Sequence, residues 1–185
     1  MSAPLPPPDS RALGRAAELI RVASRPVIIA GLQCRAEDAP WLRAFAEALP
    51  APVLTTSQAK EALPEAHPLA LGILAGGDAD DAVLGLADLI VTFGLDPTEL
   101  NPRRWPYPAL VVCLTRTPPS GFPFTPLVEV LGDLGLILEE LAPRLRGQTQ
   151  VDWDMVQLDR LNKTSVVLLL AGEGGALNLQ TIPLP

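Results

Sequence analysis

Glycines and acidic residues, more than nucleophiles, stand where this sequence could do chemistry. Gly31 ends the apolar run 27–30, Gly94 ends the run 89–93, and Gly76-Gly77 come just before an expected helix. Glycine lets a backbone approach a bound anion closely, and the free N–H groups at a helix N-terminus favour negative charge. The spacing therefore indicates a cleft that could hold a phosphate group.

Three aspartates in the same region oppose an anionic ligand. Asp78, Asp80 and Asp81 fall in the first turn of the helix expected over 79–86, where they complement the helix dipole and would repel a diphosphate. Asp78 is expected to be the N-cap of that helix, because aspartate is a preferred capping residue. No EF-hand spacing follows them, so these carboxylates do not indicate a calcium site.

The sequence has few of the residues that act as nucleophiles or bind metal ions. His67 is the single histidine, and no serine or cysteine beside it completes a catalytic relay, so it is expected to be a hydrogen-bonded loop residue. Cys34 and Cys113 are expected to be reduced thiols that fill apolar space. A reactive thiol needs a neighbouring cation, for which only Arg35 and Arg116 are candidates. We therefore predict neither a catalytic residue nor a metal ligand.

The charge balance and the termini exclude further classes of protein. The 185 residues carry a formal net charge of −7, whereas nucleic acids and anionic membranes require basic patches on their partners. The N-terminus lacks the basic and apolar regions of a signal peptide, and no run reaches the ~18 apolar residues of a membrane span. A cytoplasmic protein without a nucleic-acid or membrane partner is expected.

Alternating helices and apolar strands must position these residues. Periodic apolar side chains predict helices over 11–23, 39–49, 79–86 and 134–145, the last of them capped by Asp133. Continuous apolar runs predict strands buried on both faces over 27–30, 53–54, 89–93, 110–114 and 127–131. The pattern is typical of an α/β fold, a three-layer Rossmann-like wound parallel sheet of about six strands with helices on both faces. A ligand would lie at the carboxyl ends of the strands, near Gly31, Thr55, Gly94 and Leu114.

The chain is expected to divide into three parts. Residues 1–10 form a proline-rich leader, 11–146 the α/β domain, and 147–185 an extension with a linker, a helix over 153–161 and a strand over 166–171. No helix follows that last strand to shield it. Self-association through the extension is therefore expected.

Four blocks of sequence carry a family resemblance. They are 25–31 (RPVIIAG), 52–72 with Ala59-Lys60 and the run Pro64–Gly72, 87–94 (ADLIVTFG), and Gly132-Asp133. In order and spacing these blocks resemble the central domain of thiamine-diphosphate-dependent enzymes, the acetolactate synthase, benzoylformate decarboxylase and pyruvate oxidase relatives. The resemblance covers about residues 11–145 and implies a six-stranded parallel sheet. In some relatives this domain binds FAD or ADP.

The resemblance also implies a vestigial cofactor cleft. The glycine-rich turn of FAD-binding relatives is similar to Gly31-Leu32-Gln33, where two side chains enter the space. Further contact loops correspond to 56–58 and 74–77, and Asp96 stands where those relatives have an arginine, with Lys60 and Arg35 as the cations that could compensate. FAD or ADP binding is therefore disfavoured. The candidate cofactor-binding residues are Gly31, Gln33, Thr56, Ser57, Gln58, Gly76, Gly77, Gly94 and Asp133.

The function implied by the resemblance is that of a non-catalytic central domain, a truncated or split-enzyme module that packs against other domains or subunits. It is not expected to be active alone, because thiamine diphosphate and magnesium belong to the complete three-domain enzyme. The alternative is an independent regulatory protein that binds FAD, ADP or a similar nucleotide. The loop Trp105-Pro106-Tyr107-Pro108 is either a hydrophobic plug or a partner contact. The tail 168–180 resembles the start of the family's magnesium motif, with Glu173 in place of the aspartate, or is a last strand and turn.

Overall fold

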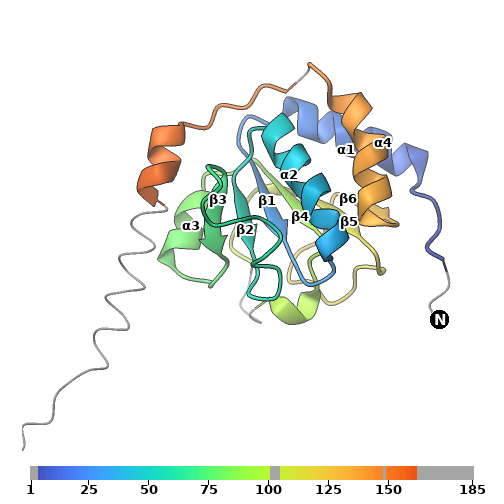
Figure 1. Cartoon of the computed structure of the whole chain (residues 1–185), viewed down its shortest axis with the longest axis horizontal. Coiled ribbons are helices and arrows are strands. Elements are labelled where there is room, and N and C mark those ends of the chain that lie inside the picture. Colours follow the sequence, from blue (N-terminus) through green and yellow to red (C-terminus); the bar gives the residue numbers. More distant parts are fainter. Residues whose placement is uncertain (1–3, 101–104, 148, 162–185) are drawn as a thin grey trace, which may run out of the picture.

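A parallel sheet of six strands forms the centre of the molecule. The computed structural model describes residues 4–100, 105–147 and 149–161. The strands lie in the order β3-β2-β1-β4-β5-β6 (Figure 1), so the direction of winding reverses between β1 and β4. That reversal is the point at which open parallel sheets usually bind ligands. The bounds are β1 Pro26–Ala30, β2 Val53–Thr55, β3 Ala70–Ile73, β4 Leu89–Phe93, β5 Leu110–Thr115 and β6 Val128–Leu131.

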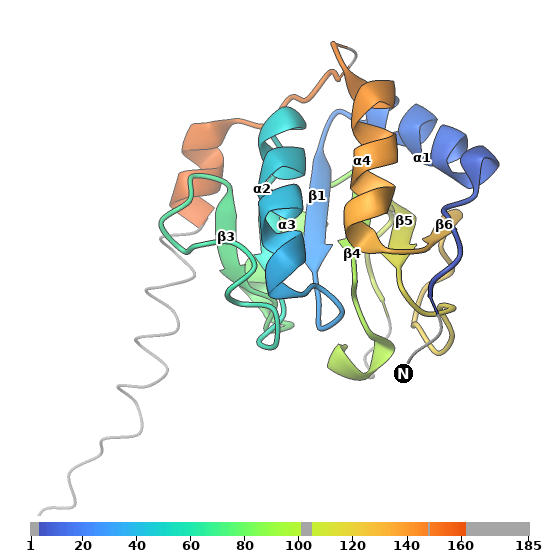
Figure 2. The same ribbon diagram turned by 45° about the vertical axis from the view of Figure 1, so that its right-hand side comes forward.

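Helices cover both faces of the sheet, as Figure 2 shows. Three of them, α1, α2 and α4, share one apolar core with side chains such as Ile28 and Val91, whereas α3 shares the other with Ile29 and Ile90. Neighbouring residues of a strand thus enter opposite cores, which explains why the strand sequences are continuously apolar. The bounds are α1 Ser10–Val22, α2 Ala39–Ala48, α3 Asp78–Leu84 and α4 Leu134–Leu145, with short 3-10 helices η1 Ala36–Asp38 and η2 Pro97–Glu99.

The fold confirms the predicted class and corrects two details. The strand β3 was not expected, because its four residues at the sheet edge carry little pattern and Gly72 has a positive φ of 100°. The cap of α3 is Gly77, in an extended conformation and with no side-chain cap bond, so the prediction that Asp78 caps this helix is wrong. Asp133 does cap α4, accepting hydrogen bonds from the N–H groups of Gly135 and Leu136.

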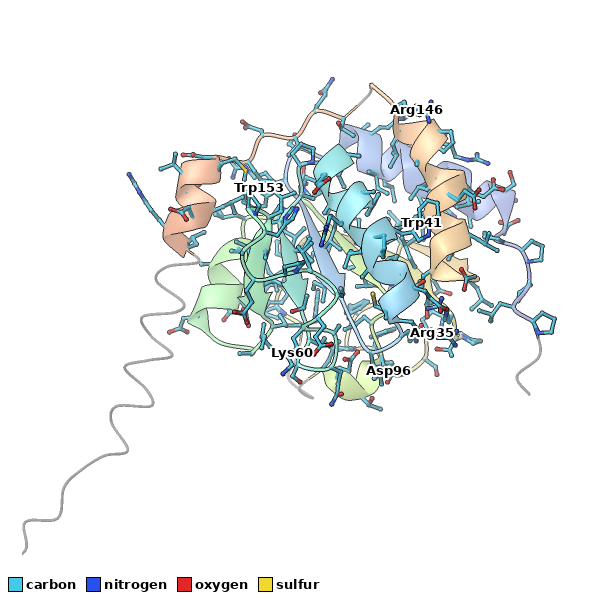
Figure 3. The ribbon with its side chains drawn as sticks, in the orientation of Figure 1. Arg35, Trp41, Lys60, Asp96, Arg146 and Trp153 are labelled. Carbon is cyan, nitrogen blue, oxygen red and sulfur yellow. The ribbon has the colours of Figure 1, made fainter. Side chains whose placement is uncertain are left out.

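Residues beyond α4 return to the sheet. The Asp152 N–H donates to the Ser24 carbonyl over 2.7 Å, and the Trp153 indole donates to the Pro26 carbonyl over 2.8 Å, both at the amino end of β1. Residues 155–161 are helical, and Leu158 is only 2% exposed in the α3-side core. Figure 3 shows Trp153 between this helix and the sheet. The strand expected over 166–171 and the tail 168–180 lie outside the described residues. None of the described helices has the length and apolarity needed to cross a membrane.

Candidate functional site

The loops that follow the parallel strands meet at one edge of the sheet. Gly31 and Gly94 lie side by side there, because the Gly31 N–H donates to the Phe93 carbonyl and the Gln33 N–H donates to the Gly94 carbonyl, over 3.0 and 2.8 Å. Gly94 has φ of 64°, and a side chain there would meet Leu134 at 2.8 Å. The structure thus brings two predicted glycines together at the switch point, where backbone crowding requires them.

Glu99 is the residue at this edge that sequence reasoning missed. Its carboxylate accepts hydrogen bonds from the Leu32 N–H at 2.8 Å, the Asp96 N–H at 2.9 Å and the Thr56 hydroxyl at 2.5 Å. These donors belong to the loops after β1, β4 and β2. The capping-box spacing from Asp96 to Glu99 was a sequence signal for one of these bonds. Nothing local in the sequence indicated the other two.

The close approach that Gly31 permits is made by the chain itself. A Cβ at Gly31 would lie 2.5 Å from the Glu99 carboxylate oxygen and 2.5 Å from the Leu95 Cα. In nucleotide-binding sheets, the glycine after the first strand leaves this space for a diphosphate. Here a carboxylate is in it, so the residues present do not fit FAD or ADP in that position.

A second carboxylate holds the other predicted anion loop. Asp80 is buried, and its Oδ2 accepts the Ala75 N–H at 2.7 Å and the Gly76 N–H at 2.6 Å. This places Gly76 at the cleft, whereas Gly77 serves as the cap of α3. The backbone donors that could have bound a phosphate are therefore engaged by an acidic side chain of the same chain.

Two cavities flank Glu99. One, of about 440 Å³, is lined by residues that include Leu32, Thr56, Ser57 and Gln58. The other, of about 380 Å³, is lined by Gly76, Asp81, Trp105 and Tyr107 among others. The loop 56–58 thus lies at the cleft. The second cavity is bounded by aromatic rings and by carboxylates.

An aromatic cluster forms one wall of the cavity of about 380 Å³. Trp105 contacts Tyr107 edge-on and Phe124 at a ring-centre distance of 4.5 Å, and Phe122 stacks on Phe124. The Tyr107 hydroxyl donates to an Asp81 carboxylate oxygen over 2.6 Å. The loop that begins at Trp105 therefore packs as a plug against the α3-side core.

Gln33 and Asp133 belong to a separate buried network centred on Arg116. The Arg116 guanidinium bonds both carboxylate oxygens of Asp38, at 2.7 and 3.0 Å, and one of Asp133 at 2.7 Å. The Gln33 side-chain oxygen accepts the Arg116 N–H at 2.8 Å and the Thr115 hydroxyl at 3.0 Å. These contacts join the ends of β1, β5 and β6. Both predicted residues therefore have structural partners.

Charge pairing decides the ionisation of this network. Burial by itself would lower the pKa of Arg116, but hydrogen bonds and proximity to Asp38 and Asp133 raise that pKa well above its usual value. Burial raises the pKa of Asp133, and bonds from Arg116 and from α4 backbone N–H groups outweigh it, so the net shift is downward. Both shifts favour the charged forms of Arg116 and Asp133, so Arg116 acts as a charged clamp between the strand ends.

The remaining candidates take ordinary structural roles. Burial, reinforced by Asp38, raises the pKa of the Cys34 thiol to about 12, and burial raises that of Cys113 to about 11; both are free. His67 bonds Glu47 at 2.8 Å in a loop. Arg35, Lys60 and Asp96 lie along the carboxyl edge in Figure 3, where Arg35 pairs with exposed Glu37 at 3.5 Å. Within residues 4–100, 105–147 and 149–161, no group of three or more metal-ligating side chains occurs.

Comparison with known proteins assigns the family. Residues 13–141 match the model of the thiamine pyrophosphate enzyme central domain. The sulfoacetaldehyde acetyltransferase of Rhodobacter capsulatus is 34% identical over 158 residues, which are 78% of this chain and 26% of that protein. An acetolactate synthase of Mycobacterium bovis is 38% identical over 90 residues, 47% of this chain and 15% of the synthase. The chain thus spans about a quarter or less of these relatives.

Solved structures agree with this assignment. A putative thiamin diphosphate-dependent enzyme from Mycobacterium smegmatis superposes with a TM-score of 0.65 at 26% identity, covering 80% of this chain and 30% of that one. Benzoylformate decarboxylase from Polynucleobacter necessarius shares the fold, with a TM-score of 0.64 at 24% identity and coverage of 82% and 31%. This chain belongs to the thiamine pyrophosphate enzyme family and has the fold of its central domain.

Proposed function

We propose that this chain is the central scaffold domain of a thiamine-diphosphate enzyme in the cytoplasm and that the thiamine chemistry takes place on other domains or subunits. The observation that carries the proposal concerns the carboxyl-edge cleft, which is the space around Gly31, Glu99 and Gly76 where the loops after the strands meet. Acidic side chains of the chain itself already fill its hydrogen-bonding positions. Glu99 and Asp80 already engage its backbone N–H groups, and Arg116 ties three strand ends together. An edge whose hydrogen-bonding groups are already paired within the chain is rigid, and it is suited to positioning neighbouring domains rather than to binding a ligand.

Thiamine diphosphate and Mg²⁺ would be held outside this chain. The family match over 13–141 and the coverage of about a quarter of the acetyltransferase support a module that works beside others. Other domains or subunits of such an enzyme, or a second copy of this chain, would be its partners. Light scattering of the purified chain tests the second of these: a monomer at high concentration would remove self-association from the proposal.

A calorimetric titration tests the division of labour. Thiamine diphosphate with Mg²⁺ is expected to give no heat of binding to this chain alone. In parallel, residues 11–161 replace the aligned central part of the R. capsulatus acetyltransferase. The chimera is expected to assemble and to retain acetyltransferase activity. Saturable binding of thiamine diphosphate by the chain alone would contradict the proposal.

A second function has one observation in its favour. The cavity of about 380 Å³ beside Trp105 and Tyr107 lies near the switch point of the sheet, where a regulatory nucleotide could be recognised by stacking. A thermal-shift screen with FAD, ADP, NAD and coenzyme A distinguishes it from the scaffold role. Stabilisation by one of these compounds would support an independent nucleotide-binding protein. If none of the four compounds stabilises the chain, this second function is excluded.

A further inference from the structure

The contacts of Glu99 reach further than a helix cap requires. Within η2 the carboxylate needs only the Asp96 N–H, three residues earlier. It also accepts from the Leu32 N–H and the Thr56 hydroxyl, which lie 67 and 43 residues away in the chain. A carboxylate that collects donors from three strand ends is bound as a ligand would be bound, by groups that converge on one anion.

Asp80 repeats this arrangement on a separate loop. Its carboxylate lies in the first turn of α3 but accepts two N–H groups from the preceding loop, those of Ala75 and Gly76, at 2.7 and 2.6 Å. The residue is only 6% exposed. A buried carboxylate is stable only when such donors replace its water shell. The two positions therefore use the same chemistry independently.

We propose that Glu99 and Asp80 are built-in anions that occupy both backbone N–H sites of the carboxyl-edge cleft and exclude diphosphate ligands from it. Each carboxylate takes the donors that a phosphate would use, and each adds a negative charge beside which a diphosphate would be repelled. Gly31 is required because Glu99 and Leu95 press on it. The inference goes beyond the scaffold role and does not depend on it, and it is incompatible with the alternative function for any nucleotide that carries a diphosphate.

Removing one carboxylate at a time should convert the cleft into an anion site. The experiment follows backbone amide signals by NMR while inorganic pyrophosphate is added. In the natural chain, the Leu32, Asp96, Ala75 and Gly76 amides are expected to show no saturable shift. In Glu99→Ala the Leu32 and Asp96 amides should shift saturably, with pyrophosphate binding at least tenfold tighter than in the natural chain. In Asp80→Ala the response should move to Ala75 and Gly76, and Asp80→Asn, whose amide oxygen can still accept these N–H groups, should bind more weakly.

Matched variants distinguish the effect of emptying the site from the effect of removing its negative charge. Glu99→Gln keeps the size of the side chain and should bind more weakly than Glu99→Ala. Glu139→Ala removes one exposed charge from α4 and should leave all four amides unchanged. If a Glu99 variant does not fold, the Asp80→Ala and Asp80→Asn variants give the same test on the second loop. Saturable shifts of these amides in the natural chain would overturn the proposal, as would folded variants that bind no pyrophosphate. Neither result bears on the domain-exchange test of the scaffold role.

Discussion

The Arg116 clamp allows a sharp test of what holds the strand ends together. Replacing Arg116 by Met keeps an unbranched stem and removes every donor of the guanidinium. Asp38, which is 2% exposed, then keeps only the hydrogen bond from the Arg35 N–H at 2.7 Å. Asp133 loses the same partner, but its side chain is 37% exposed and can recover water. The substitution therefore leaves one carboxylate buried without its counter-charge.

Breaking a buried ion pair by removing one partner typically destabilises a protein by about 3–5 kcal/mol. We expect the lower end, about 3 kcal/mol, because Asp38 retains one N–H donor and Asp133 is partly exposed. This is a large part of the total, since domains are stable by about 5–15 kcal/mol. For a chain of this size it corresponds to a fall in Tm of roughly 6–12 °C.

Urea unfolding followed by far-UV circular dichroism measures the effect. The matched control is Arg35→Met, because Arg35 pairs with Glu37 at 3.5 Å with both side chains more than half exposed. Surface pairs of this kind contribute little, so the control should lose no more than about 0.5 kcal/mol. A loss below about 1 kcal/mol for Arg116→Met, or a loss equal to that of the control, would refute the account of the clamp.

Three further predictions follow from described contacts. At pH 8, alkylation of Cys34 and Cys113 by iodoacetamide should be at least a hundredfold slower than that of free cysteine, as followed by mass spectrometry, because their pKa values near 12 and 11 leave little thiolate. Calorimetry should show Gly31→Ala destabilised by about 1–3 kcal/mol through its 2.5 Å clash, and Gly14→Ala stabilised by about 0.5–1 kcal/mol, since helical Gly14 has room for a methyl group. Because the folded state lowers the pKa of Asp133, this residue stabilises the fold at pH values above its unfolded-state pKa of about 4. Urea unfolding should show this contribution disappearing as the pH falls through the lower pKa of the folded state. Asp133→Asn should flatten that pH dependence, and a profile unchanged by the substitution would contradict the prediction.

Local patterns predicted most of the fold because burial on both faces leaves a plain signal. The runs at β1 and β4 and the cap at Asp133 could be identified directly, since each depends on residues adjacent in sequence. The strand β3 escaped because it is short and contains a glycine in a conformation that strands do not favour. The cap of α3 was misassigned because Asp80, not Asp78, reaches back to the loop.

The site was only partly predictable for a different reason. The glycines at the carboxyl edge follow from strand endings, and the acidic character of the region was visible in the composition of its loops. The partners of Glu99 and Arg116, by contrast, come from loops that meet only after the sheet has formed. Such long-range pairings carry no periodic signal, so the chemical state of the cleft could not be derived from the sequence.

The return of residues 149–161 to the sheet has a practical meaning for anyone dividing this chain. The family match ends at residue 141, and the change in sequence character falls near 146, yet Trp153 and Leu158 complete the α3-side core. A fragment cut at either position would uncover an apolar surface and lose the bond that fastens the amino end of β1. We therefore expect the smallest piece that folds well to be longer than the piece that sequence comparison recognises, and fragments for expression should end after residue 161.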